Sequence, residues 1–162
     1  MGNFITPQLV LKRTLEADLP FLFEIQLDAE ANYLAAFTSS DFSNKEAFLE
    51  KYSKFLPDPT KNTQTIFLDE VIIGSIAKFE IEGDAEITYW LDKKYWGKGL
   101  ATKALEIFLS GEKTRPILGR VAFDNFASQR LLEKNGFTKI GSDKGFANAR
   151  QQEIEEFIYR LT

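Results

Sequence analysis

The most constraining feature of this sequence is the stretch from Ile87 to Thr102, where a strand pattern runs through a glycine-containing loop into a helix pattern. Residues 87–92 alternate between the two faces of an extended chain, and apolar residues after Gly97 and Gly99 recur at helical spacing. The first N–H groups of a helix lack internal partners and lie at the positive end of its dipole. The stretch therefore predicts a cradle for a phosphate or pyrophosphate group.

The spacing of the two glycines excludes one common cradle and disfavours another. A P-loop has four residues between its glycines, whereas only Lys98 separates Gly97 from Gly99. The run Gly97-x-Gly99-x-x-Thr102 approaches a dinucleotide-binding fingerprint, but it lacks the third small residue and does not open a βαβ unit. The loop alone is compatible with two other interpretations. One is a flavin- or nucleotide-binding α/β domain, and the other is a helix N-terminus with a purely structural role.

Composition narrows the available chemistry. The 162 residues include no cysteine and no histidine, which excludes disulfides, thiol nucleophiles, the usual zinc sites and Ser-His-Asp catalysis, so no metal is expected. A net charge of −4 argues against nucleic acid as a partner. No apolar run is long enough for a membrane span, and the myristoylation-like motif Met1-Gly2-x-x-x-Thr6 lacks a following basic stretch. We expect a cytoplasmic protein without a membrane partner, with one domain over residues 1–162.

The rest of the chain is predicted to form strands and helices, and it contains no linker segment and no internal repeat. Strands are expected at 9–15, 63–68, 71–80, 85–92, 117–123, 138–142 and 152–161, with a polar loop at 143–150. Helices are expected after Asp18, from Ser43 (which has a capping-box spacing to Glu46), at 100–111 and at 129–135. The helix between strands 85–92 and 117–123 allows these two strands to lie parallel.

Two motifs together resemble the GNAT superfamily of N-acetyltransferases. The hexad Trp96-x-x-Gly99-x-Ala101 resembles the loop that wraps the pyrophosphate of acetyl-coenzyme A, and its Trp is similar to the RimJ/RimL-type branch of ribosomal-protein N-terminal acetyltransferases. One helix and one strand later, the segment 125–137, NFASQRLLEKNGF, resembles the second signature of the family. The resemblance implies an α/β fold with a mixed, mostly antiparallel sheet of six or seven strands and about four helices. Strands 85–92 and 117–123 would splay apart and hold coenzyme A between them.

The resemblance also implies a set of binding residues. Backbone N–H groups around Trp90 and Leu91 would bind the thioester carbonyl, and the first turn of the helix would bind the pyrophosphate. The implied cofactor-binding set is Trp90, Leu91, Trp96, Gly97, Lys98, Gly99, Leu100, Ala101, Thr102 and Asn125. Asn125 would hydrogen-bond the pantetheine arm, or it would only cap its helix. Tyr33 and Phe37 either line the acceptor site, together with loop 143–150, or belong to the core.

Catalysis would be direct acetyl transfer to a primary amine through a ternary complex. Many relatives carry a Tyr seven residues after the motif's Asn, where this chain has Leu132. The RimJ/RimL-type branch has Ser at the third position after that Asn, so Ser128 is the candidate for stabilising the departing thiolate. Glu86 is the best-placed carboxylate for a general base acting through water, unless it faces solvent.

The expected function is therefore acetyl-CoA-dependent N-acetylation of a protein N-terminus or a small amine. The alternative is a non-catalytic coenzyme A-binding module, which the missing Tyr favours. Dimers are common in the superfamily, so a homodimer is an option by analogy alone.

Overall fold

A computed structural model describes residues 8–162, so the myristoylation-like motif at residues 1–6 lies outside the described residues. One mixed sheet has the strand order β1-β2-β3-β4-β5-β7-β6. The strands are β1 (Leu9–Arg13), β2 (Asn62–Leu68), β3 (Val71–Ile81), β4 (Asp84–Leu91), β5 (Ile117–Ala122), β6 (Thr138–Ala147) and β7 (Gln152–Leu161). The helices are η1 (Glu16–Asp18), α1 (Leu19–Ile25), α2 (Ala29–Ala35), α3 (Lys45–Phe55), η2 (Lys93–Tyr95), α4 (Leu100–Gly111) and α5 (Phe126–Lys134).

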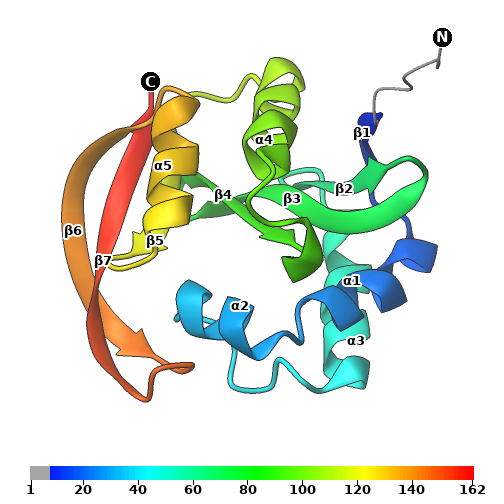
Figure 1. The fold of residues 1–162 in the computed structure, drawn as a ribbon, viewed down its shortest axis with the longest axis horizontal. Helices are drawn as coiled ribbons and strands as arrows, with labels where there is room; N and C mark the ends of the chain where they lie inside the picture. The colour runs from blue at the N-terminus through cyan, green and yellow to red at the C-terminus, as the bar shows by residue number, and fades with distance from the viewer. Residues whose placement is uncertain (1–7) are drawn as a thin grey trace, which may run out of the picture.

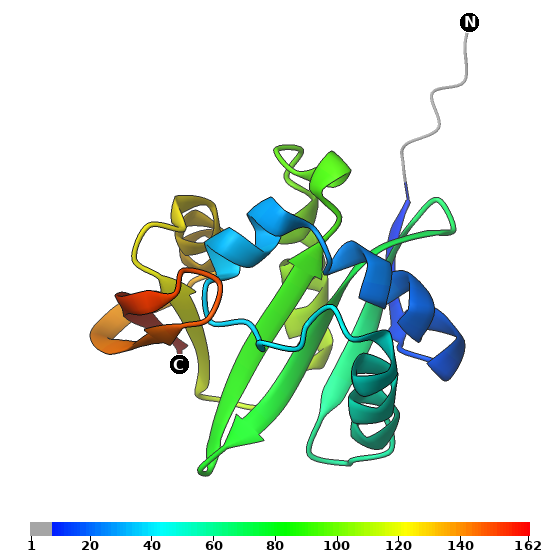
Figure 2. The ribbon, with the colours of Figure 1, turned by 90° about the horizontal axis from the view of Figure 1, so that it is seen from below.

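Helices cover both faces of this sheet. Figures 1 and 2 show α4 and α5 on one face and α1, α2 and α3 on the other. Neighbouring strands are antiparallel except for β4 and β5, which are parallel and joined by the crossover helix α4. The predicted mixed, mostly antiparallel α/β fold is confirmed, with five α-helices in residues 8–162 where about four were expected.

The main core lies between the sheet and α4 with α5. Helix α4 buries Ala104, Leu105, Phe108 and Leu109, the stripe expected from a period of 3.6 residues. Side chains of β3, β4 and β5 meet this stripe, and burying each large apolar side chain stabilises the fold by about 2 kcal/mol. The packing fixes the axis of α4, and therefore also the place of its N-terminus.

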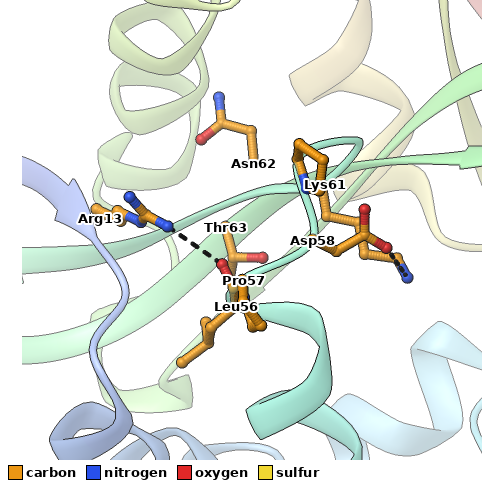
Figure 3. Close-up of a pocket in the computed structure, with 8 residues that line it drawn as sticks. Arg13, Leu56, Pro57, Asp58, Lys61, Asn62 and Thr63 are labelled. Carbon is orange, nitrogen blue, oxygen red and sulfur yellow. Dashed lines mark hydrogen bonds and ion pairs between the residues drawn. The ribbon is translucent and has the colours of Figure 1, made fainter.

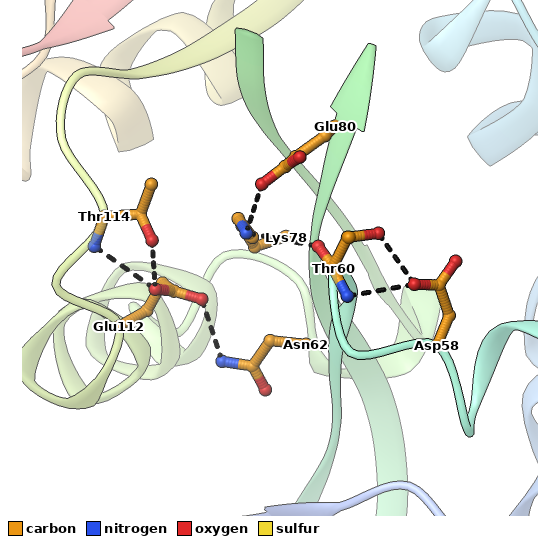
Figure 4. A network of polar contacts seen from close by, with 7 residues as sticks. All are labelled: Asp58, Thr60, Asn62, Lys78, Glu80, Glu112 and Thr114. Atoms are coloured by element: carbon orange, nitrogen blue, oxygen red, sulfur yellow. Dashed lines mark hydrogen bonds and ion pairs between the residues drawn. The ribbon is translucent and has the colours of Figure 1, made fainter. Parts of the chain in front are cut away.

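Polar contacts hold the other end of α4 against the start of β2 (Figure 4). The Glu112 carboxylate, at the C-cap of α4, accepts hydrogen bonds from Asn62 Nδ2 at 3.2 Å and from Thr114 Oγ1 at 2.9 Å. Nearby, the Lys78 ammonium donates to the carbonyl of Thr60 and to Glu80, each at 3.1 Å. The C-terminal end of α4 is thus tied to the start of β2.

Three expected element boundaries are wrong. Asn44, rather than Ser43, caps α3, since its Oδ1 accepts from the N–H of Ala47. Helix α5 begins at residue 126, three residues earlier than expected, because Asn125 caps it. Strand β6 continues to residue 147 through the expected polar loop. As an edge strand exposed along most of its length, β6 accommodates charged side chains that would not suit a central strand.

Candidate functional site

The gap between β4 and β5 is the feature that organises the site. The two strands pair over only three positions, from Ala85–Ile117 to Ile87–Gly119. Beyond these positions the strands diverge, as Figure 2 shows, while β5 keeps pairing with β7 as far as Ala122. The predicted splay of the two parallel strands is confirmed, and it opens at their C-terminal ends.

Backbone N–H groups at the end of β4 face this gap. The N–H of Asp92 donates to the carbonyl of Ile73 at 2.7 Å, which makes these two residues a hydrogen-bonded pair of the β3–β4 ladder. Hydrogen-bonded pairs alternate along an antiparallel ladder. The N–H of Trp90 therefore points toward β3, and those of Tyr89 and Leu91 point toward the gap. Of the two residues predicted to bind a thioester carbonyl, Leu91 has the suitable direction.

The glycine loop has the backbone conformation of an anion cradle. Gly97 and Gly99 have φ angles of +76° and +75°, in the left-handed region that side chains rarely adopt. Gly99 is the N-cap of α4 and offers no side-chain cap to the first turn, which also carries no acidic residue. The N–H groups of residues 100–102 are accordingly presented at the positive end of the helix dipole.

Side chains around the loop hold it in place. The indole Nε1 of Trp96 donates to the carbonyl of Leu91 at 2.9 Å and so fastens the loop to the end of β4. Leu100 and Ala101 pack on the main core. Lys98 is exposed, with its ammonium 5.8 Å from the centre of the Tyr95 ring. Trp96 therefore holds the loop through its hydrogen bond to Leu91, and the Lys98 side chain lies on the exposed surface of the loop.

Helix α5 begins on the opposite side of the gap. Asn125 caps it, with Oδ1 accepting from the N–H of Ser128 at 3.4 Å and Nδ2 donating to the carbonyl of Leu34 at 3.3 Å. The side chain of Asn125 is thus the helix cap that one of the two sequence interpretations proposed. Ser128 is half-buried in the first turn, beside the Tyr89 hydroxyl that enters from β4. Sequence reasoning missed Tyr89, although strand alternation places it with Ile87 and Leu91 on the face toward α4 and α5.

Glu86 lies on the opposite face of β4 from Tyr89, and it is buried. Its carboxylate pairs with Arg120 Nε at 3.3 Å, and Arg120 Nη1 also pairs with Glu156 at 3.2 Å. Burial raises the pKa of Glu86, while Arg120 opposes the change, and the pKa of Glu156 is raised for the same main reason. Glu86 is therefore not the solvent-facing residue of the alternative interpretation, and its raised pKa suits a proton acceptor.

Helix α2 bridges the open end of the gap on the same face as Glu86. Its first turn joins η2, which follows β4, through an ion pair between Glu30 and Lys93, and its last turn receives the bond from Asn125. Arg150, from the β6–β7 connection, donates to the carbonyl of Tyr33 and stacks 3.9 Å from the centre of the Tyr33 ring. The helix thus forms a wall that is held by contacts distant in sequence.

The two aromatic residues expected at the acceptor site differ in environment. Tyr33 keeps 52% of its surface exposed under the Arg150 guanidinium, which pairs with both oxygens of Asp124 at 2.8 and 2.9 Å. Phe37 packs on a small apolar cluster that joins α2 to β5 and the β6–β7 hairpin. Tyr33 therefore presents an exposed ring at the surface, whereas Phe37 serves mainly as packing.

Other parts of the described chain offer less. A shallow pocket at the α3–β2 connection is lined by Arg13, Lys61 and Asp58 among others, but Arg13 already donates to the carbonyl of Leu56 (Figure 3). This pocket lies at the start of β2, two strands away from β4, and so outside the gap between β4 and β5. Within residues 8–162, no three His, Cys, Asp or Glu residues are grouped as metal ligands. None of the helices in this range has the length and apolar character of a membrane span.

Comparison with known proteins agrees with this geometry. The family model described as an acetyltransferase (GNAT) domain matches residues 8–138. An uncharacterized N-acetyltransferase, p20 of Bacillus licheniformis, is 25% identical over 99% of this chain and 96% of its own length. The ribosomal-protein-serine acetyltransferase of Escherichia coli K12 is 35% identical over 47% of this chain and 46% of its own.

Solved structures share the fold at lower identity. The ribosomal-protein α-N-acetyltransferase RimL, in complex with coenzyme A, has a TM-score of 0.79 at 19% identity, over 93% of this chain and 92% of that one. A chimera of the spermidine N-acetyltransferase SpeG from Vibrio cholerae and hSSAT has a TM-score of 0.76 at 22% identity, over 93% and 94%. The matched family model, the splayed strands and the glycine loop lead to one conclusion: the chain belongs to the GNAT family of N-acetyltransferases.

Proposed function

We propose that this protein binds acetyl-coenzyme A in the gap between β4 and β5 and transfers the acetyl group directly to a primary amine. The observation that carries the proposal is the splay of β4 from β5 beside an uncapped α4 N-terminus. A pyrophosphate would bind the N–H groups of residues 97–102, with Lys98 and the Thr102 hydroxyl as further donors. The pantetheine arm would extend along β4 past Asn125.

The thioester carbonyl would accept a hydrogen bond from the N–H of Leu91. This donor lies at the end of β4, where the developing negative charge of the tetrahedral intermediate needs stabilising. Ser128 would donate to the sulfur as the carbon–sulfur bond breaks. Because the chain has no cysteine or histidine, transfer without an acyl-enzyme is the route that its residues favour.

Glu86 would accept the proton that the amine loses. Leu91 lies five positions further along β4, which corresponds to about 16 Å along a strand, so the proton would travel through water. The acceptor would enter on the α2 side, past Tyr33. RimL is an N-terminal acetyltransferase of a ribosomal protein and SpeG a spermidine acetyltransferase. By analogy we propose a protein N-terminus or a small polyamine-like amine as the acceptor.

One observation favours a second candidate, a coenzyme A-binding module without catalysis. Leu132 stands where many relatives carry a Tyr, and its side chain is 1% exposed, turned into the core against β5. A module of this kind would bind acetyl-coenzyme A through the same loop and release no product.

Turnover separates the two candidates. The purified protein is mixed with acetyl-coenzyme A and a panel of amines that includes ribosomal-protein N-terminal peptides and spermidine, and free thiol is followed with a thiol-reactive dye. Because the protein itself has no cysteine, the dye reports only released coenzyme A. Release that depends on the amine supports the transferase. Tight binding of acetyl-coenzyme A without release from any amine would support the module.

A further inference from the structure

Arg120 holds two carboxylates at the point where β4 and β5 separate. The last paired residues of the two strands are Ile87 and Gly119, so Arg120 is the first residue of β5 beyond the pairing. Its Nε pairs with Glu86 of β4 at 3.3 Å, and its Nη1 pairs with Glu156 of β7 at 3.2 Å. The guanidinium therefore links the two strands that flank β5 in the sheet.

Stability alone does not explain a cluster of this kind. The side chains of Glu86 and Glu156 keep only 7% and 17% of their surface exposed, and Arg120 keeps 34%. Taking charges out of water carries a penalty that ion pairing often fails to offset, and apolar side chains in such positions are often equally or more stabilising. Two carboxylates that share one guanidinium also leave one negative charge uncompensated. The cluster therefore needs another reason, and one of its members is the proposed proton acceptor.

The charged groups around Glu86 act on its ionisation in opposite directions. Burial raises the pKa of Glu86 and is the largest influence, while the Arg120 guanidinium opposes it. The charges of Glu156 and Asp84 add to the rise in pKa. On β3 the residue opposite Glu86 is Phe79, which carries no charge. A general base works best when its pKa lies near the working pH. Burial alone would favour the neutral acid, an unshared Arg120 would make Glu86 a weaker base, and a guanidinium shared with Glu156 gives a state between these two.

We propose that Arg120 is a positioning residue for Glu86: it holds the Glu86 carboxylate in place where the gap begins and keeps it ionised, while Glu156 restrains Arg120 from the other side. This inference rests on the proposed function. In the transfer, the amine nitrogen bonds to the carbonyl carbon, the carbon–sulfur bond breaks, and sulfur leaves with its electron pair. The proton of the amine passes through water to Glu86 and then to solvent, and the thiolate takes a proton from water. Arg120 and Glu156 exchange no proton.

The test begins with Glu156→Gln, which removes one negative charge and leaves a side chain of the same shape beside Arg120. Asp143 faces position 156 across the β6–β7 ladder and loses only a repulsive neighbour, so the variant should fold. Because Arg120 then pairs with Glu86 alone, the acid limb of kcat, measured at saturating amine and acetyl-coenzyme A, should move to lower pH. Glu155→Gln, the same change on the opposite face of β7, is the matched control and should leave the acid limb in place.

Two substitutions of Arg120 separate its charge from its geometry. Arg120→Met leaves both carboxylates without a cation, so the acid limb of kcat should move to higher pH, opposite to the change in Glu156→Gln. Arg120→Lys keeps the charge, but an ammonium is a point charge that does not bridge two carboxylates as the planar guanidinium does. We therefore expect Arg120→Lys to reverse most of the shift seen in Arg120→Met, while its plateau kcat stays about tenfold below that of the wild type. Urea titration establishes that each variant is folded.

A second readout does not require turnover. The carboxyl ¹³C resonance of Glu86, assigned by its loss in Glu86→Gln, reports the ionisation of this side chain in an NMR pH titration. Its midpoint should fall in Glu156→Gln and rise in Arg120→Met. An unmoved midpoint in both variants, or a wild-type plateau kcat in Arg120→Lys, would overturn the proposal. If the NMR midpoints move as expected but the acid limb of kcat does not follow them, or no amine is acetylated, the result contradicts the proposed function instead of the link between Arg120 and Glu86.

Discussion

The two sides of the gap are built in different ways. On the cofactor side, the end of β4, the glycine loop and the start of α4 form one continuous segment of sequence, fixed by local conformation. On the acceptor side, α2 is held by Asn125 and Arg150, which are 91 and 117 residues away from their partners Leu34 and Tyr33. The comparison teaches that a cofactor cradle can be local while the acceptor wall depends on the whole fold.

The largest effect is expected where the cofactor side meets the sheet. A Cβ built on Gly74 would overlap the carbonyl oxygen of Trp90, so in Gly74→Ala the end of β4 must move. We expect a loss of about 3 kcal/mol of unfolding free energy by urea titration, with weaker acetyl-coenzyme A binding. Gly141→Ala, with nothing within 4 Å of the new methyl group, is the control. If Gly74→Ala is destabilised but binds acetyl-coenzyme A as the wild type does, then cofactor binding does not depend on the position of the end of β4, and the contrast between the two sides is wrong.

The next effect tests the wall alone. Arg150→Met removes a guanidinium that is 3% exposed and leaves Asp124, 29% exposed, without its partner. We expect a destabilisation of about 2 kcal/mol, while acetyl-coenzyme A affinity stays within about threefold. Arg115→Met, at an exposed arginine that donates to backbone carbonyls, is the comparison variant. If the affinity for acetyl-coenzyme A falls by as much free energy as the stability does, then α2 and the glycine loop are coupled, and the two sides of the gap are not independent.

The same ion pair predicts a dependence of stability on pH. Hydrogen bonds from Arg150 hold the pKa of Asp124 below its usual value. The stabilisation is therefore complete above the unfolded pKa of about 4 and is lost as the pH falls through the lower, folded value. Urea titrations from about pH 6 to 3 should show a shallower acid loss in Asp124→Asn than in the wild type. Parallel curves would mean that the pair contributes nothing.

The smallest effect concerns Lys98. As an exposed cation beside the loop, it should add little to the binding of a pyrophosphate. Lys98→Ala is expected to weaken acetyl-coenzyme A about two- to threefold at low salt, with the difference vanishing at high salt. Lys94→Ala, in the preceding turn, should have no effect. A tenfold loss in Lys98→Ala would make this lysine a principal phosphate ligand.

Sequence reasoning reached the cofactor side because its determinants are local. Alternation gave β4, the glycines marked the loop, and the helical period gave α4, all within two residues of their observed bounds. On the acceptor side it named Tyr33 and the segment 143–150, but it did not predict the contacts between them. Nothing near Tyr33 or Arg150 in the sequence shows that they will stack, and the partnership of Glu86 with Arg120 and Glu156 arises only from strand order. Tyr89 was hidden for the same reason, since its neighbour Ser128 comes from another element.

The most direct test of the account is whether the start of α4 binds the pyrophosphate of acetyl-coenzyme A. Gly99 has a left-handed backbone that Asn and Asp both tolerate better than other side chains. Gly99→Asn and Gly99→Asp therefore strain the loop alike and differ by one charge.

Calorimetric titration of the wild type and both variants with acetyl-coenzyme A is the measurement. We predict saturable binding by the wild type, retained in large part by Gly99→Asn and weakened more than about tenfold further in Gly99→Asp by repulsion of the pyrophosphate. Equal affinities of the two variants, or no binding by a folded wild type, would contradict the account.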